Sequence, residues 1–368
     1  MHIKIQKEKF LKALSAVTNI ISQRPTLPIL ANVLLETNDT NTLILTGTDM
    51  EIAISKRIEA TVQEEGSITI PAKKLLDIAR ELPTETVEIA VSRTNSVSIT
   101  SGKAFIKLLG LGREDFPTFP AFNESSGFEI SLSVLQECIR LTSFAVSNDE
   151  NKYVLNGMLF TIQEGVLKIV STDGRRLAYI SHEIPQAKKT ELHVIIPAKT
   201  IHEISRVVPE NENEMVRIIS LKNQVVFKFA NGFVISRLIE GHFPDYEKVI
   251  PPTAKKGALV ERNSFLSVLR RAYLLTSKEA QGVKLDFLKD KILVTAKSPN
   301  LGELKEEIDV TNTGGTLSIG FNPLFLIDVL KNMDDDKVLF TLTDVDKPGV
   351  IRKENGDYLC VIMPMQIG

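Results

Sequence analysis

Residues 70–83 read IPAKKLLDIARELP, and residues 196–209 read IPAKTIHEISRVVP, so one pattern returns after 126 positions. A fainter third copy, FNPLFLIDVLKNM, occupies residues 321–333. A repeat of this length is too long for a solenoid unit and matches the size of a whole domain. The sequence therefore predicts three similar domains in tandem.

A second segment follows the same period. The helix-like stretch at residues 5–22 recurs at residues 130–147 and 260–277, and each copy ends on Ser. Segments rich in Pro, Gly, Ser and charge at residues 123–127 and 251–257 mark the linkers. The expected domains are residues 1–124, 128–251 and 254–368.

The first helix-like segment of a copy carries an apolar stripe at helical spacing. The second segment begins with Pro71 or Pro197, at a plausible first helical position. The residues expected on the core side of the first segment are Phe10, Leu14, Val17 and Ile21 in one copy and Phe265, Leu269 and Tyr273 in another.

Alternating segments such as residues 42–47 and 51–58 predict strands. Strands grouped around two helices indicate an α+β domain with antiparallel sheets. Hairpin turns are signalled at Thr94-Asn95, Ser101-Gly102, Asn231-Gly232 and Asn355-Gly356.

The composition is that of an ordinary globular protein, with 368 residues, 43% hydrophobic and 24% charged. No run of about 18 apolar residues occurs and the N-terminus lacks an apolar signal core, so we expect no membrane span and a cytoplasmic location. Cys138 and Cys360 lie in apolar surroundings in different repeats, which favours buried thiols over a disulfide. The two cysteines and five histidines show no metal-ligand spacing, so neither a metal nor a cofactor is expected.

The formal net charge of −2 hides an uneven distribution, although taken alone it argues against a nucleic-acid binder. The six helical segments together carry +6, which leaves −8 for strands and loops. If all six helices face one way, that face is basic on an acidic body and can hold a polyanion.

The second helices share a finer pattern of charge at positions i, i+4 and i+7. Side chains at this spacing lie on one face, and each acid can pair with the base three residues on. In one helix this pattern is ordinarily a solvated face, but its recurrence favours a functional face. The three sets are Lys73-Asp77-Arg80, Lys199-Glu203-Arg206 and Leu324-Asp328-Lys331.

Short motifs stand in order along the chain: RPTLPIL at residues 24–30, Thr48-Asp49, LNGMLF at 155–160, TDGRRL at 172–177, FPDY at 243–246, IGFN at 319–322 and MPM at 363–365. Together they resemble the bacterial DNA polymerase III β subunit, the sliding clamp. The similarity covers the whole chain, with the length and three-domain periodicity of that family.

The resemblance implies a non-catalytic processivity factor, a head-to-tail homodimer closing into a ring of six DNA-clamp domains. Antiparallel sheets would lie outside, and two helices per domain would line the hole. A ring that slides holds duplex DNA by sequence-independent phosphate contacts. Val154 stands where the family often has a second aromatic residue. An alternative role for Arg24 is to form a structural salt bridge. The residues expected to face DNA are Arg24, Lys73, Lys74, Lys152, Tyr153, Lys199, Arg206 and Arg271.

The resemblance also implies an apolar cleft between the second and third domains. It would bind short peptides of the DNA polymerase III catalytic subunit, the clamp loader, other polymerases and repair proteins. The chain end, VIMPMQI at residues 361–367, is unusually apolar and rich in adaptable methionine, although completing the last strand would also explain it. The cleft residues would be Leu155, Thr172, Gly174, Arg175, Arg176, Leu177, Pro244, Lys248, Val249, Val361, Met363, Pro364, Met365, Gln366 and Ile367.

Three residues of this region depart from the family pattern. Arg175 stands where the family often has His, Lys248 where it often has Arg, and Gly368 extends the tail. These departures concern the polar rim of the cleft more than its apolar floor.

The dimer seam is the third implied site. In a head-to-tail ring, a surface of the first domain meets a surface of the third, a contact that closes after two copies. The resemblance assigns Phe105 and Ile106 to one side of the seam and Leu274 and Leu275 to the other.

Two other functions are compatible with parts of the sequence. A metal-dependent nucleic-acid enzyme would use Asp49 and Asp173, which occupy matching Thr-Asp turns. A turn-forming role explains both, and the sequence has no phosphate-binding Gly-rich loop with a following Lys and no evident nucleophile–histidine pair. The other alternative is a structural DNA-binding protein that does not encircle its ligand.

Overall fold

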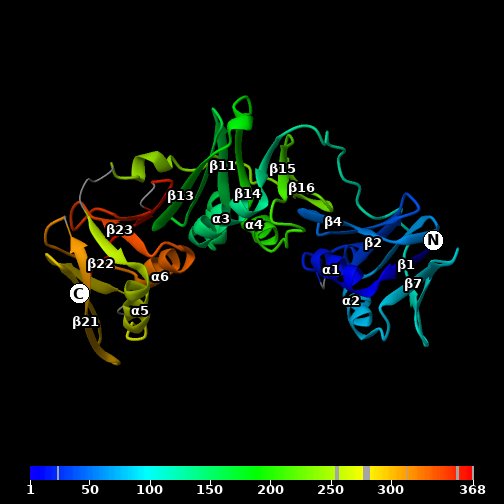
Figure 1. The fold of residues 1–368 in the computed structure, drawn as a ribbon, viewed down its shortest axis with the longest axis horizontal. Helices are drawn as coiled ribbons and strands as arrows, with labels where there is room; N and C mark the ends of the chain where they lie inside the picture. Colours follow the sequence, from blue (N-terminus) through cyan, green and yellow to red (C-terminus); the bar gives the residue numbers. More distant parts are fainter. Residues whose placement is uncertain (23–24, 253–256, 277–281, 313, 354–355, 367–368) are drawn as a thin grey trace. The chain divides into compact units, whose positions relative to one another are not determined.

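The computed structural model describes residues 1–368 except 23–24, 253–256, 277–281, 313, 354–355 and 367–368 (Figure 1). The chain gathers into two compact units. The first unit contains Met1–Leu132 and Val208–Leu238, and the second contains Ser133–Val207 and Ile239–Gly368.

The first unit holds helices α1 (Lys7–Thr18) and α2 (Ala72–Glu81), which pack against each other. Its described strands form two antiparallel sheets, in the orders β5-β1-β7-β8-β9 and β10-β15-β16-β17-β4-β3-β2-β6. The strands are β1 (His2–Gln6), β2 (Asn32–Thr37), β3 (Thr42–Thr48), β4 (Ile52–Glu59), β5 (Thr61–Glu64), β6 (Gly66–Pro71), β7 (Thr86–Val91), β8 (Ser96–Ser101), β9 (Ala104–Leu109), β10 (Phe128–Ser131), β15 (Met215–Ser220), β16 (Gln224–Phe229) and β17 (Gly232–Arg237).

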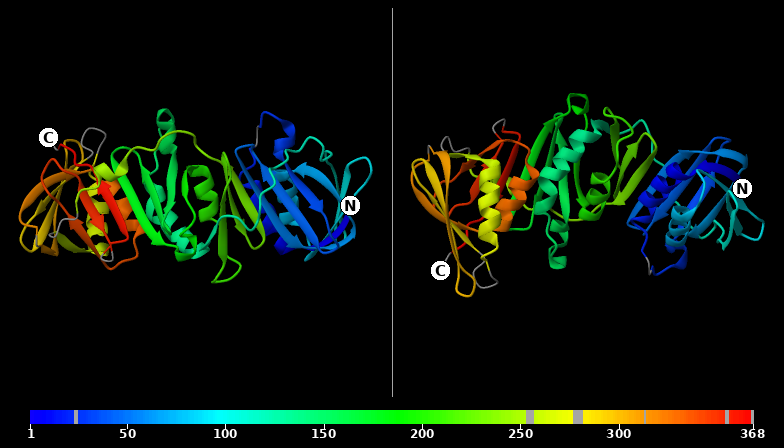
Figure 2. Two further views of the ribbon diagram at one scale, coloured as in Figure 1. Left: turned by 90° about the horizontal axis from the view of Figure 1, so that it is seen from above. Right: turned by 60° about the horizontal axis from the view of Figure 1, so that its bottom comes forward.

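The second unit holds most of α3 (Leu132–Thr142), together with α4 (Ala198–Ser205), α5 (Arg262–Tyr273) and α6 (Pro323–Asn332). Figure 2 shows α5 and α6 side by side. Its described strands form one sheet in the order β14-β11-β12-β13-β25-β24-β23-β18-β21-β20-β19-β22. The strands are β11 (Gly157–Gln163), β12 (Val166–Thr172), β13 (Arg176–Glu183), β14 (Leu192–Pro197), β18 (Ala258–Glu261), β19 (Val283–Phe287), β20 (Lys291–Ser298), β21 (Gly302–Asn312), β22 (Leu317–Phe321), β23 (Lys337–Thr341), β24 (Gly349–Arg352) and β25 (Tyr358–Ile362).

The division between the units falls inside the middle expected domain because the strands of that domain pair in two directions. Strand β17 pairs with β4 of the first copy, and strand β13 pairs with β25 of the third. Main-chain hydrogen bonds thus continue each sheet across a boundary between repeats.

The expected apolar stripes are confirmed except at their C-terminal ends. Helix α1 ends at Thr18, so Ile21 lies beyond it and Ile20 is buried instead. Tyr273 is 41% exposed, and Ala272 takes the buried place in the last turn of α5. The remaining stripe residues Phe10, Leu14, Val17, Phe265 and Leu269 are buried.

The second helices begin one residue later than expected. Pro71 and Pro197 are the N-cap residues of α2 and α4, with extended ψ angles, and not their first helical residues. In the third copy Asn322 is the N-cap, and its side chain accepts a hydrogen bond of 3.0 Å from the Leu324 N–H. The expected turns at Thr94-Asn95 and Ser101-Gly102 join β7 to β8 and β8 to β9, with φ 57° at Asn95 and Gly102. Asn355 lies outside the described residues.

One device closes the C-terminus of the second helix in every copy, where backbone carbonyl groups lack helical partners. A side chain of the first helix donates to them. Lys7 Nζ donates to Arg80 O at 2.9 Å, Gln136 Nε2 to Val207 O at 2.8 Å, and Arg262 NH1 to Leu330 O at 3.2 Å. Cations at two of these ends also oppose the negative end of the helix dipole.

Both cysteines are free and buried, as expected. Burial raises the pKa of the Cys138 thiol to about 12 and also raises the pKa of Cys360. Neither thiol is therefore a ready nucleophile at neutral pH. Among the described residues, no helix is long and apolar enough to cross a membrane.

Candidate functional site

The turn between β12 and β13 is the framework of the expected cleft. Thr172 Oγ1 donates to Arg176 O at 2.6 Å and accepts from the Gly174 N–H at 3.1 Å. Asp173 Oδ1 accepts from the N–H groups of Arg175 and Arg176 at 2.8 and 3.0 Å. Gly174 has φ 88°, a conformation that favours glycine. The side chains of the TDGRR motif thus fix their own backbone.

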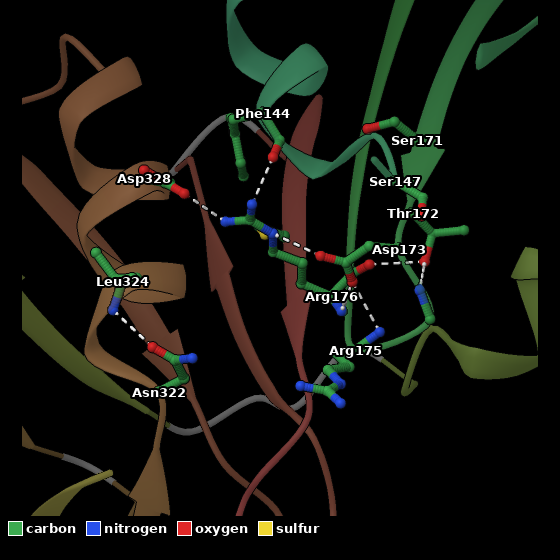
Figure 3. A network of polar contacts seen from close by, with 12 residues as sticks. Phe144, Ser147, Ser171, Thr172, Asp173, Arg175, Arg176, Asn322, Leu324 and Asp328 are labelled. Carbon is green, nitrogen blue, oxygen red and sulfur yellow. Dashed lines mark hydrogen bonds and ion pairs between the residues drawn. The ribbon is translucent and has the colours of Figure 1, made fainter. Parts of the chain in front are cut away.

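Arg176 ties this turn to helix α6 (Figure 3). Its guanidinium donates to Asp173 Oδ2 at 3.1 Å, to Asp328 Oδ2 at 2.6 Å and to Phe144 O at 2.6 Å. The group also lies 4.6 Å from the ring centre of Phe325 and 5.3 Å from that of Phe144. The side chain is only 11% exposed. Arg176 therefore acts as a bracket between the second and third repeats, with its charge already matched by two carboxylates.

An apolar cluster lies beside this bracket. Leu177 of β13 pairs with Val361 of β25, and both are buried. They belong to a cluster with Leu159, Val170, Ile195, Ile239, Val350 and Leu359, against which Val154, Tyr179, Phe243, Tyr246 and Ile250 pack. Partial burial raises the pKa of Tyr246 to about 12.

Two apolar residues of the expected cleft are exposed to solvent. Val249 is 50% exposed and Met363 is 45% exposed. Leaving apolar area of this kind in water costs about 25 cal/mol per Å², so a partner that covers it gains free energy.

The chain end runs past β25 along both repeats. The Met363 N–H donates to Arg175 O at 2.9 Å, and the Met365 N–H donates to Gly320 O at 2.9 Å. The interpretation that the tail completes the last strand holds for Val361, because β25 ends at Ile362. Beyond that residue the tail bridges the TDGRR turn and strand β22.

The other expected cleft residues are placed as follows. Thr172 is buried, and Leu155, Pro364 and Met365 are half-buried. Gly174, Arg175, Pro244, Lys248 and Gln366 are exposed. Asp245 accepts from Lys248 at 2.8 Å, and this bond raises the pKa of Lys248 and lowers that of Asp245. Ile367 and Gly368 lie outside the described residues.

The residues expected to face DNA differ in whether their charged groups form ion pairs. Lys73 and Lys74 are exposed on α2, and in the described part of the chain neither forms an ion pair. Arg271 forms a two-bond ion pair with Glu306, at 2.9 and 2.5 Å. Lys152 Nζ donates to Asp173 O at 2.9 Å, which brings it to the TDGRR turn. Tyr153 and Lys199 are exposed, and Arg24 lies outside the described residues.

The expected pairing within the second helices holds in two copies. Asp77 pairs with Arg80, and Glu203 with Arg206, each at 3.7 Å. In the third copy the expectation is wrong, because Asp328 pairs with Arg176 and not with Lys331. The pattern of acids pointed to Asp328, but nothing local indicated a partner 152 residues away.

The residues assigned to the seam are apolar and accessible. Phe105 on β9 is 65% exposed and Leu274 at the end of α5 is 74% exposed, while Ile106 and Leu275 are half-buried. Large exposed side chains of this type are typical of an interface.

Asp49 and Asp173 are structural. Asp49 Oδ1 accepts from the N–H groups of Glu51 and Ile52 at 3.0 and 2.9 Å. This turn has the same hydrogen bonds as the turn at Asp173. Among the described residues, no group of three His, Cys, Asp or Glu side chains is arranged to hold a metal ion.

The architecture is that of three tandem clamp domains. Models of the DNA polymerase III β subunit match throughout, with its N-terminal domain at residues 1–120, its central domain at 129–245 and its C-terminal domain at 247–366. The chain belongs to the family of DNA polymerase III β subunits, the β sliding clamps. It is accordingly a non-catalytic processivity factor, and the enzyme alternative is wrong.

Related β sliding clamps are similar to this chain over its full length. The β sliding clamp of Chlamydia muridarum is 33% identical over 100% of this chain and 99% of its own, and that of Pseudomonas aeruginosa is 34% identical over 100% of both. The crystal structure of the Pseudomonas aeruginosa subunit superposes with a TM-score of 0.93, again at 34% identity and full coverage of both chains. The Bacillus subtilis clamp gives 0.95 at 30% identity, also with full coverage.

Proposed function

We propose that two copies of this chain close head to tail into a ring around duplex DNA. The ring tethers the DNA polymerase III catalytic subunit, the clamp loader, other polymerases and repair proteins through their short peptides. A cytoplasmic protein that joins the nucleoid when loaded fits this role. The proposed domains are residues 1–124, 128–251 and 254–368.

The observation that carries the tethering role is the apolar cluster beside the TDGRR turn, which would form the floor of the proposed cleft. Its floor, at Leu177 and Val361, is buried within the protein, while Val249 and Met363 remain accessible at its edge. A peptide with a Gln followed by leucine and phenylalanine would bury its apolar end there. Its Gln would lie near the backbone of Met365.

The internal repeat supports the ring. Strands β4 and β13 each pair on their outer side with the last strand of the next repeat. In the third repeat the corresponding part of β21, residues 302–306, has no outer partner among the described residues, and β9 has a neighbour only in β8. A second copy would supply the missing pairing, with its β9 beside this β21. Such free edges otherwise invite uncontrolled association.

The helices supply the DNA face. A net charge of +6 on six helical segments in each chain suits loose, water-mediated phosphate contacts. Lys73 and Lys74 contribute full charges, while the charges of Arg206 and Arg271 are partly offset by their carboxylate partners. A modest field holds DNA without impeding sliding.

The test of the ring is the double variant Leu274→Ala with Leu275→Ala. We expect light scattering to give twice the chain mass for the parent and the single mass for the folded variant. The parent should stay on nicked circular DNA at high salt and leave after linearisation. A variant that remains a tight dimer contradicts the seam, and a parent that stays on linear DNA at high salt supports a non-encircling binder.

A further inference from the structure

Helix α5 carries two adjacent arginines whose charges are used differently. Arg271 donates two hydrogen bonds to the Glu306 carboxylate of β21, at 2.9 and 2.5 Å. Arg270 is exposed, and among the described residues its side chain forms neither an ion pair nor a hydrogen bond. The two neighbours have the same side chain and are both exposed, so only the tertiary structure distinguishes them.

The helix period places the two arginines on opposite flanks of the exposed face of α5. The core side of the helix consists of the buried residues Phe265, Leu266, Val268, Leu269 and Ala272. At about 100° per residue, positions 270 and 271 fall on either side of a line through Ser267 and Leu274, which are both exposed. Since Arg271 reaches β21, Arg270 lies on the flank away from that strand.

The flank that carries Arg270 faces helix α6. Arg262, Leu266 and Arg270 follow one another at a spacing of four residues, so they lie along the same flank of α5. Arg262 NH1 donates to Leu330 O of α6 at 3.2 Å. Helices α5 and α6 also lie side by side in Figure 2. Arg270 is therefore on the α6 side of α5.

Helix α6 offers Arg270 no carboxylate. The one acidic residue of this helix is Asp328, and it is bonded to Arg176 at 2.6 Å. The exposed residues of α6 include Lys331, a second cation that forms no ion pair in the part of the chain that the structure describes. Two unmatched positive charges of the third repeat thus lie on this side of its helices.

The flank that carries Arg271 is different, because it borders an acidic strand. Residues 303–307 of β21 comprise three glutamates and one lysine. Glu306 pairs with Arg271, Glu303 with Lys297 at 3.4 Å, and Glu307 with Lys291 at 2.8 Å. The charge of Arg271 is therefore balanced by its surroundings, and its side chain connects α5 to β21.

We propose that Arg270 is the residue of α5 that contacts the phosphates of duplex DNA, assisted by Lys331 of α6, and that Arg271 mainly holds β21. The inference rests on the proposed ring around DNA and changes which cation of the third repeat makes the contact. A guanidinium without a carboxylate partner has all its donors available for a phosphate. Arg271 would first have to break its ion pair with Glu306, so it contributes less.

The experiment measures binding of the full-length protein to a short synthetic duplex by fluorescence anisotropy, at salt concentrations from about 50 to 200 mM. Arg270→Gln should weaken binding by a similar factor on two duplexes of unrelated sequence. It should also reduce the slope of log affinity against log salt by about one. Arg270→Lys should keep most of the slope, because a phosphate also accepts from an ammonium group.

The matched comparison is Arg271→Gln, which removes the same charge from the next residue of the same helix. The two variants have equal net charge, so a difference between their slopes reports contact and not the general field of the protein. We expect Arg271→Gln to change the slope by less than about half as much. Lys189→Gln, at an exposed position outside the helices, should leave the slope unchanged. Light scattering checks that each variant keeps the mass of the parent.

The outcomes separate this inference from the proposed function. If Lys73→Gln lowers the slope and both arginine variants leave it unchanged, the protein binds DNA and the assignment of Arg270 is wrong. Equal losses for the two arginine variants, or a larger loss for Arg271→Gln, would also overturn the assignment. If the parent shows no salt-dependent binding to either duplex, the proposed function at DNA fails together with this inference.

Discussion

Two junctions between successive domains share one backbone design and differ in their side chains. Where β4 meets β17, the turn Thr48–Ile52 repeats the hydrogen bonds of Thr172–Arg176 where β13 meets β25. The Arg237 N–H donates to Glu51 O as the Met363 N–H donates to Arg175 O, both at 2.9 Å. The two junctions are structural copies.

The floors of the two junctions are different. Leu177, Val170 and Tyr179 of the second junction correspond to Ala53, Thr46 and Ser55 of the first. Thr46 Oγ1 donates to Ser55 Oγ at 3.2 Å, so polar groups satisfy each other in the buried floor of the first junction. The second junction has an apolar floor instead.

The linkers at the two junctions also differ in how fully their side chains cover the junction. Phe122, the counterpart of Val249, lies edge-on against Phe233 with ring centres 5.5 Å apart and packs on the cluster of Ala53, Val226 and Ile235. The first junction is thus covered by its own linker. At the second junction Tyr246 and Ile250 of the linker also pack on the apolar cluster, but Val249 is 50% exposed. Under the proposed function, the same backbone design gives a closed joint at the first junction and a peptide-binding site at the second.

The largest effect should come from Arg176, whose counterpart in the first junction is the buried Ile52. Arg176→Ala leaves Asp173 and Asp328 without their common partner, and we expect a loss of about 3 kcal/mol in the free energy of unfolding by denaturant titration. Arg176→Lys should recover less than half, because an ammonium cannot bridge both acids and the two rings. A loss below about 1 kcal/mol would mean that the bracket is not structural.

The next effect concerns the exposed edge of the second junction. Met363→Ala should weaken binding of the Gln-Leu-Phe type of peptide by about tenfold, since a buried anchor contributes about 1–3 kcal/mol. Thermal stability should hardly change, because the side chain is already half exposed. Phe122→Ala, at the closed junction, is the contrast: it should lower stability and leave peptide affinity unchanged. Equal effects of both variants on peptide affinity would place binding at both junctions.

The two turns allow an exchange with effects of opposite sign. Met50 has φ 79° where its counterpart Gly174 has φ 88°. A residue with a side chain is strained in this conformation by about 1 kcal/mol. We expect Met50→Gly to raise the melting temperature and Gly174→Ala to lower it, each by a few degrees. An added Cβ at Gly174 meets only the flexible end of Lys152, so sterics do not obscure the comparison.

The smallest effect concerns the third repeat, where Arg271 pairs with Glu306. The hydrogen bond from Arg271 lowers the pKa of Glu306 below its ordinary value of 4.5. A depressed pKa in the folded state means that the pair stabilises the protein above about pH 4.5 and that this contribution is lost as the pH falls through the folded pKa. Because the pair is exposed, its contribution to stability should be small.

The variant Glu306→Gln tests whether Arg271 contacts DNA. It should flatten the pH dependence of stability near pH 4 and free the charge of Arg271 for phosphate. Retention of the ring on DNA should then persist to a slightly higher salt concentration, measured on nicked circles. Unchanged retention would remove Arg271 from the set of residues proposed to face DNA.

The local pattern predicted the helices well and their ends less well. Apolar spacing placed Phe265 and Leu269 in the core because burial of a stripe follows from the helix period. It failed at Ile21 and Tyr273, since the last turn of a helix is decided by capping and by what packs beyond it. Pairs three residues apart on a helix, such as Asp77 with Arg80, were likewise readable from spacing.

The sequence by itself determined the threefold repeat, the α+β class of each domain, the buried thiols and, through its ordered motifs, the family. Each of these depends on local periodicity or on residue identity. Only the tertiary structure decided that Arg176 pairs with Asp328, that Lys152 lies at the TDGRR turn, and that Phe122 packs against Phe233 at one junction while Val249 stays exposed at the other. These outcomes join residues distant in the chain, and their energies depend on distance and burial, which no local pattern records.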